Sequence, residues 1–209
     1  MNDASRRRLS LSLLPVLFCL ASVVEGNAQP SRTQGWMLGV ESGATAVSLG
    51  GNPGDGAALV GARIGRRLNR IVIPYLGTAY ADIESRGLET FDRLTFAHVD
   101  VGVRVQLADG RRRWEPYGDL ALTWWPVTDV LRDGEPTHMD FTSGPTLSLG
   151  GGFAVYLSET WALDVNVKAG KGRFTDVPGP AGGTDRHAGA PRELDATSIR
   201  LGVGFSWWP

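Results

Sequence analysis

The chain has 209 residues, with 21 Lys plus Arg against 22 Asp plus Glu and a formal net charge of −1. This balance excludes the basic surface typical of nucleic-acid-binding proteins, and the length is that of one domain. Beyond residue 28 no apolar run approaches the roughly 20 residues of a membrane-spanning helix. A membrane form of this chain would therefore have to cross as strands.

The first 28 residues have the composition of a secretory signal peptide. Three arginines at 6–8 precede an apolar run over 11–24, and the small residues Gly26 and Ala28 follow. We predict cleavage after Ala28, since the apolar run is too short for a membrane anchor. Cleavage would remove Cys19, the single cysteine, and leave a thiol-free chain suited to the oxidising periplasm. Residues 29–35 then form a short N-terminal segment before a domain over 36–209.

The remainder of the chain predicts eight amphipathic strands. They span 36–48, 58–68, 71–83, 94–107, 114–127, 144–157, 161–174 and 196–208. The connections 49–57, 84–93, 128–143 and 175–195 are long, and those between them are short. Outer-membrane barrels alternate in this way because tight turns face the periplasm and long loops face outside. The predicted fold is an all-β, eight-stranded antiparallel up-and-down transmembrane β-barrel.

Each predicted strand has one apolar and one polar face. In the strand over 94–107, Val101, Val103 and Val105 alternate with Asp100 and Arg104, which indicates one dry and one wet side. The polar faces are rich in glycine, which a solvent-facing strand would not favour. In a narrow barrel, however, small residues leave room for long polar side chains to cross the lumen. We therefore expect the apolar face to contact lipid and the polar face to line the interior.

Aromatic residues near strand ends suggest girdles at the two membrane interfaces. The residues expected there are Trp36, Tyr75, Trp124, Trp125, Phe153, Trp161, Phe174, Trp207 and Trp208.

The strand phase predicts a balanced set of charges in the lumen. The acidic members are Glu41, Asp100, Asp119 and Asp164, and the basic members are Arg63, Arg104, Lys168 and Arg200. An unpaired buried charge is strongly destabilising and a hydrogen-bonded pair is tolerated. The prediction is a plugged barrel, and the alternative is a gated path for protons or ions along these charges.

The last strand resembles the assembly signal of outer-membrane barrels. Its residues are Arg200-Leu201-Gly202-Val203-Gly204-Phe205-Ser206-Trp207, and the signal positions are Arg200, Gly202, Phe205 and Trp207. The segments over 74–77 and 116–118 resemble strand openings of the small eight-stranded families, such as the OmpX-like, OmpA-barrel-like and opacity-protein groups. This resemblance implies a Gram-negative outer-membrane location, with outer-membrane lipids, periplasmic chaperones and the barrel-assembly machinery as partners. The chain departs from the pattern by ending in Trp208-Pro209.

Residues suited to catalysis or metal binding are few. The three histidines are His98, His138 and His187, and none stands in a nucleophile-and-base pattern with a serine. An acidic cluster of Asp129, Asp133, Glu135 and Asp140 matches no calcium-loop spacing. We therefore expect no catalytic, cofactor or metal site.

The leading functional hypothesis is a structural or surface-interaction protein whose long extracellular loops contact an extracellular ligand. The alternatives are a narrow ion or small-solute channel, a lipid-modifying barrel enzyme, and a soluble calycin-like ligand-binding barrel.

Overall fold

A computed structural model describes residues 35–50, 55–84, 93–108, 113–132, 135–177 and 192–209. These residues form ten strand segments. They are β1 (Gly35–Leu49), β2 (Asp55–Arg67), β3 (Val72–Glu84), β4 (Arg93–Gln106), β5 (Trp114–Trp124), β6 (Pro126–Arg132), β7 (Glu135–Thr142), β8 (Thr146–Tyr156), β9 (Trp161–Val177) and β10 (Arg192–Trp207). No described segment is a helix long and apolar enough to cross a membrane.

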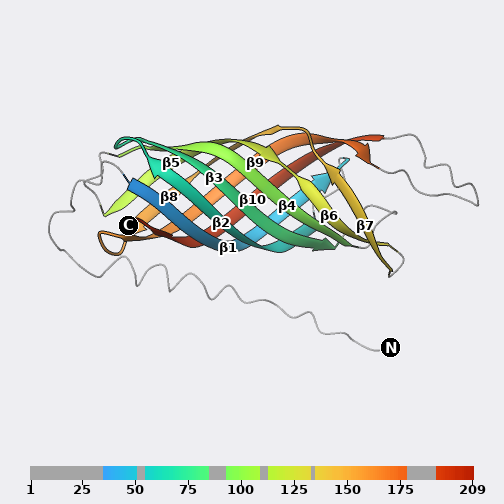
Figure 1. Ribbon diagram of the computed structural model, residues 1–209, viewed down its shortest axis with the longest axis horizontal. Coiled ribbons are helices and arrows are strands. Elements are labelled where there is room, and N and C mark those ends of the chain that lie inside the picture. Colours follow the sequence, from blue (N-terminus) through green and yellow to red (C-terminus); the bar gives the residue numbers. More distant parts are fainter. Residues whose placement is uncertain (1–34, 51–54, 85–92, 109–112, 133–134, 178–191) are drawn as a thin grey trace, which may run out of the picture.

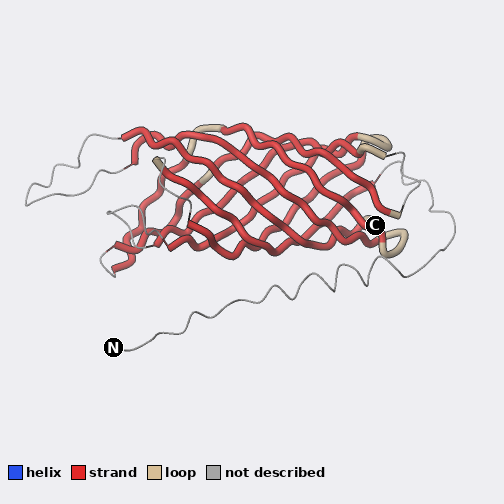
Figure 2. Tube along the Cα trace, turned by 180° about the vertical axis from the view of Figure 1, so that it is seen from behind, coloured by secondary structure: helices blue, strands red, loops and turns tan. Residues whose placement is uncertain are grey.

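The segments occupy eight positions of one closed antiparallel sheet. Two positions hold two segments end to end: β4 pairs first with β6 and then with β5, and β5 and β6 pair in turn with β8 and β7. Pairing of β1 with β10 and of β3 with β4 closes the ring. The strands cross the barrel at a steep tilt, and the C-terminus lies at the end that carries the short turns (Figures 1 and 2). The predicted eight-stranded barrel is confirmed.

All four predicted long connections are shorter in the structure, and two of them differ most. The connection expected over 128–143 is mostly the β6–β7 hairpin, which projects at the end of the barrel opposite the C-terminus (Figure 1). The connection expected over 175–195 is shortened because β9 continues to Val177 and β10 begins at Arg192. Both predictions were wrong because polar, Pro- and Asp-containing residues are typical of loops, whereas here they take part in strand pairing.

Side chains alternate between the interior and the outer wall. Val101, Val103 and Val105 are exposed on the outside, whereas Asp100 and Arg104 of the same strand are buried inside. The outer wall is therefore apolar and the middle of the lumen is polar, which is the reverse of a water-soluble barrel.

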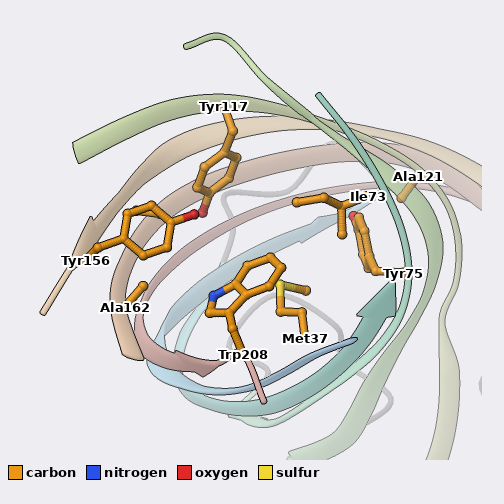
Figure 3. Packing of buried hydrophobic residues seen from close by; sticks show 9 residues of the cluster. Met37, Ile73, Tyr75, Tyr117, Ala121, Tyr156, Ala162 and Trp208 are labelled. Carbon is orange, nitrogen blue, oxygen red and sulfur yellow. The ribbon is translucent and has the colours of Figure 1, made fainter. Parts of the chain in front are cut away.

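Apolar side chains also fill the lumen near both of its ends. The outer layer, at the end away from the C-terminus, contains Val47, Ile83, Phe96, Trp125, Val127, Phe174 and Ala196. The inner layer, at the end with the short turns, contains Met37, Ile73, Tyr75, Tyr117, Ala121, Ala154, Tyr156, Ala162 and Trp208. Figure 3 shows Trp208 at the centre of the ring of strands, with Met37 beside it.

These two layers correct part of the predicted aromatic girdle. Trp36, Phe153, Trp161 and Trp207 are exposed on the outer wall, as a girdle requires. Four of the expected girdle residues are instead buried inside the lumen: Tyr75, Trp125, Phe174 and Trp208. Their strand phase places them inside, because Trp208 alternates with Trp207, and Trp125 follows Thr123 and Asp119 on the inner face.

Candidate functional site

The polar middle of the lumen is the candidate site, and Asp100 of β4 is its most heavily bonded carboxylate. Arg200 of β10 donates two hydrogen bonds to it, each 3.0 Å long, in a fork-to-fork arrangement. Lys168 of β9 donates a third at 2.9 Å, and the Thr123 hydroxyl donates a fourth at 2.7 Å. Four donors satisfy both oxygens of a buried carboxylate, so the charge is stable without water.

Arg104 forms a second centre, four residues further along the same strand and on the same face. Its Nη1 donates to Asp164 at 2.8 Å and its Nε to Asp119 at 3.3 Å. The guanidinium carbon lies 3.6 Å from the centre of the Tyr117 ring, and the Tyr117 hydroxyl donates to Asp164 at 3.0 Å. Ser206 also donates to Asp164. Arg104 thus joins β4, β5 and β9 through one side chain.

A third centre lies between β1, β2 and β9. Arg63 forms an ion pair with Glu41, and the Asn166 amide donates to the same Glu41 oxygen at 3.0 Å. The Arg63 and Glu41 side chains are partly buried, and their pairing neutralises both charges.

The structure places all eight sequence-predicted lumen charges inside the barrel and pairs each of them. The sequence analysis missed a fourth centre near the inner layer, formed by Arg67, Glu115 and Tyr156. Arg67 donates to the Tyr156 hydroxyl at 3.0 Å, and that hydroxyl donates to Glu115 at 3.0 Å. The sequence pattern could have predicted this centre. Arg67 lies four residues after Arg63, and Glu115 lies four residues before Asp119, so each pair shares the inner face of its strand.

With this centre, the described part of the lumen holds balanced charge. Its ion-paired residues are Glu41, Asp100, Glu115, Asp119 and Asp164, against Arg63, Arg67, Arg104, Lys168 and Arg200. Acidic and basic groups therefore cancel across the network. This arrangement meets the condition for burying so many charges in a small volume.

Glycines on the inner face make room for the rings of this network. A Cβ on Gly102 would lie 2.7 Å from the Tyr75 ring and hydroxyl, and one on Gly152 would lie 2.8 Å from the Tyr117 hydroxyl. Tyr75 in turn accepts a 2.7 Å hydrogen bond from Lys168. At these positions small residues therefore leave the space that long polar side chains occupy, as the sequence predicted.

Little free volume remains among the charges. The cavity lined by Glu41, Arg63, Tyr75, Asp100 and Lys168 measures about 20 Å³, which is room for about one water molecule. Together with the two apolar layers, the network fills this part of the lumen with side chains.

The histidines do not assemble a reactive centre in the part of the chain that the structure describes. His98 lies inside, with its ring centre 4.7 Å from that of Phe96, and neither ring nitrogen has a hydrogen-bond partner there. Asp133 and His187 lie outside the described residues, and for His138, Asp129, Glu135 and Asp140 only the backbone is described. Within the described residues, no group of three His, Cys, Asp or Glu side chains could hold a metal ion.

The residues of the C-terminal assembly signal divide between the two faces of β10. Arg200 and Gly202 face the lumen, and Phe205 and Trp207 are exposed on the outer wall.

Comparison with known proteins supports the fold. No family model matches the chain, and no curated protein matches it in sequence. Among solved structures, Neisserial surface protein A (NspA) matches with a TM-score of 0.60 and 12% identity, over 87% of this chain and 99% of that one. Ail, the attachment invasion locus protein of Yersinia pestis, matches with a TM-score of 0.50 and 12% identity, over 83% and 98%. The outer membrane protein OprG of Pseudomonas aeruginosa matches with a TM-score of 0.50 and 13% identity, over 86% and 98%. The chain therefore has the fold of the small eight-stranded outer-membrane barrels.

Proposed function

We propose that this chain is a Gram-negative outer-membrane protein in which a plugged barrel anchors extracellular connections that contact an extracellular ligand. Its role is structural or surface interaction, not catalysis. The observation that carries the proposal is a charge-balanced lumen inside an apolar outer wall. In this proposal, residues 1–28 are a signal peptide that is removed during export.

The outer wall supports a membrane location. Large apolar side chains project from it at many positions, including Val40, Leu76, Leu120, Leu149 and Leu201, each about half exposed. Such a surface on a soluble protein would drive aggregation, whereas lipid solvates it. A soluble calycin-like barrel needs the opposite arrangement, with apolar residues inside and charges outside.

The filled lumen favours an anchor over a channel. Solutes crossing this barrel would have to displace the Asp100 and Arg104 networks as well as both apolar layers. Each network is held by several buried hydrogen bonds, and removing one partner of a buried ion pair costs about 3–5 kcal/mol. A narrow ion or solute channel is therefore the weaker alternative.

Interaction is then assigned to the connections at the end opposite the C-terminus. These are the segments predicted over 49–57, 84–93, 128–143 and 175–195, of which the third includes the β6–β7 hairpin. Long connections on a rigid barrel are where binding residues commonly reside. Two proteins of similar fold are named as a surface protein and as an attachment invasion locus protein, which is consistent with this assignment.

Export would require periplasmic chaperones and the barrel-assembly machinery, with Arg200, Gly202, Phe205 and Trp207 as the assembly signal. Removing the two outward aromatics, Phe205 and Trp207, should slow insertion more than removing Phe153, another exposed aromatic on the outer wall.

Heat-modifiability tests the membrane-barrel part of the proposal. The full chain is expressed in a Gram-negative host, membranes are fractionated, and the protein is run on a denaturing gel with and without boiling. We expect it in the outer-membrane fraction with a shift in mobility on boiling. Recovery in the soluble fraction without a shift would overturn the proposed location.

Replacement of the distal connections tests the interaction part. Residues 178–191 and, separately, the turn at 133–134 are exchanged for short Gly-Ser linkers, and binding of intact cells to an extracellular-matrix array is measured. Loss of binding with unchanged heat-modifiability supports the proposal. Equal binding by cells that lack the protein would contradict it.

A further inference from the structure

His98 lies at the boundary between the outer layer and the charged middle of the lumen. It stands on the inner face of β4, two residues after Phe96 of the outer layer and two residues before Asp100. Its side chain is fully buried, and neither ring nitrogen has a hydrogen-bond partner within the described residues. It is the one imidazole among the described side chains, and an imidazole changes its charge between about pH 5 and pH 8.

The ring of His98 belongs to an aromatic cluster. Its centre lies 4.7 Å from that of Phe96 and 5.8 Å from that of Trp125, and both contacts are edge-to-face. Phe174 completes the cluster, with its ring centre 5.9 Å from that of Trp125 and 6.3 Å from that of Phe96. Three of these four rings belong to the outer layer, so the position of the imidazole affects how this layer packs.

The charged groups that face His98 offer no free acceptor for a second ring proton. From β9 and β10, the groups that act on the ring are the cations Lys168 and Arg200. The carboxylate that acts on it is Asp100 of its own strand, whose oxygens already accept four hydrogen bonds. From β5, the indole N–H of Trp125 can only donate, and the residue of β3 that pairs with His98 is an alanine.

A protonated ring is therefore disfavoured while the outer layer is closed. It would carry two N–H donors, and a buried donor without a partner is strongly destabilising. It would also add a positive charge beside Lys168 and Arg200, in a network whose ion-paired charges cancel. Water reaches the imidazolium only when the outer layer opens. The open layer thus binds the proton more tightly than the closed one, and its population rises as the pH falls.

Opening of the outer layer would reach the base of the β6–β7 hairpin. Trp125 joins β5 to β6 and exchanges hydrogen bonds with Ser143, which directly follows β7. Phe96 pairs with Val127 of β6. Both ends of the hairpin are therefore attached to residues of the ring cluster.

We propose that His98 is a pH-sensitive closure of the outer end of the lumen. With a neutral ring the outer layer is packed. Protonation opens this layer and loosens the base of the β6–β7 hairpin, while the Asp100 and Arg104 networks stay in place. The inference rests on the plugged barrel of the proposed function, and it adds a regulated state of the surface that is to contact the extracellular ligand.

Hydrogen exchange followed by mass spectrometry tests this closure. The full mature chain is folded in lipid vesicles and labelled at about pH 8 and about pH 5, which bracket the titration of an imidazole, with labelling times corrected for the intrinsic exchange rate. Ordinary carboxylates titrate lower, around pH 4. We expect protection of the amides over 94–98 and 125–127 to fall about tenfold at the lower pH, because each pH unit below about 6.5 raises the open-to-closed ratio by up to tenfold. Protection over 100–106 should not change.

Substitution of the histidine separates the titration from the packing. His98→Phe keeps an aromatic ring and removes both ring nitrogens, so its outer layer should stay protected at the lower pH. His98→Gln serves the same purpose if the phenylalanine variant does not fold. The matched controls are His138→Gln and His187→Gln, which should lose protection in acid as the wild type does. Heat-modifiability confirms folding for every variant.

Three outcomes would overturn the inference. They are equal protection of the outer layer at both pH values in the wild type, a loss of protection in His98→Phe as large as in the wild type, and a loss that extends over 100–106, which would mean that acid unfolds the whole barrel. Failure of the proposed function would be seen differently. A chain without a mobility shift on boiling at the higher pH would contradict the membrane barrel itself.

Discussion

Arg104 illustrates how one buried side chain joins several strands of the barrel. It is 1% exposed and donates to Asp119 and Asp164 while its guanidinium covers the Tyr117 ring. No single neighbour accounts for its position, because the partners come from β5 and from β9, which β8 separates in the ring. Its removal would leave two carboxylates without their cation.

We expect Arg104→Ala to destabilise the barrel by about 3–5 kcal/mol, because it leaves the buried carboxylates of Asp119 and Asp164 without their cation. The measurement is urea unfolding in lipid vesicles, followed by tryptophan fluorescence. Arg173→Ala is the matched control: Arg173 forms ion pairs with Glu193 and Asp195, but all three side chains are exposed. Its loss should change stability little. Equal effects of the two variants would contradict a structural role for the buried network.

Alternation in the sequence predicted which charges face the lumen but not how they pair. Asp100 and Arg104 lie on the same face of one strand, yet Asp100 pairs with Arg200 and Arg104 with Asp164. Pairing depends on the stagger between strands and on the space that glycines leave, and neither can be derived from one strand at a time. Trp125 and Trp208 were misplaced for a different reason. Both lie near strand ends, where membrane-interface aromatics occur, but their phase in the strand places both of them inside.

At the scale of the strand, glycine at an inner position is a requirement of packing. A Cβ on Gly102 would lie 2.7 Å from the Leu120 carbonyl oxygen as well as from the Tyr75 ring. The backbone of β5 cannot yield as a flexible side chain can, so the contact would displace the sheet.

We therefore expect Gly102→Ala to destabilise the barrel by about 1–3 kcal/mol through overpacking. Gly118→Ala on β5 is the control, because its Cβ would find its nearest atom, the Gly150 carbonyl oxygen, at 4.0 Å. That variant should be neutral or slightly stabilising. The measurement is the urea midpoint of unfolding of each variant in the same vesicles. A midpoint for Gly102→Ala at or above that of Gly118→Ala would contradict the packing argument.

The β6–β7 hairpin extends two of the eight strand positions beyond β5 and β8. β5 and β8 continue to pair below it, from Trp114 with Val155 to Thr123 with Thr146. The junction is braced by hydrogen bonds between Trp125 and Ser143 in both directions. The ring should therefore close without the hairpin.

Replacing residues 129–140 with Asn-Gly, a two-residue hairpin turn, should leave the barrel folded and heat-modifiable. Only the outer apolar layer, which includes Val127, is expected to loosen. Loss of the mobility shift on boiling would mean that the hairpin is needed for closure, against this description of the sheet.

Over the whole molecule, the lumen is divided into an outer apolar layer, a neutral charged middle and an inner apolar layer. Trp125 anchors the first, with its ring centre 5.9 Å from those of Phe96 and Phe174. Trp208 anchors the last and lies 4.5 Å from the Arg67 guanidinium, where it meets the charged middle. The two apolar layers lie on either side of the ion pairs, and the Asp100–Arg200 ion pair joins β4 to β10 across the lumen. In the proposed plugged barrel, closure of the lumen would therefore depend on several layers and not on one residue.

Conductance in planar lipid bilayers tests this closure most directly. The full mature chain is inserted from detergent, insertion is verified by heat-modifiability of the recovered protein, and current is recorded in 1 M KCl. A plugged lumen predicts a flat baseline without stepwise events at any applied voltage that the bilayer withstands. Stable, reproducible current steps from the folded wild-type barrel would contradict the plug and identify the charged network as the lining of a channel.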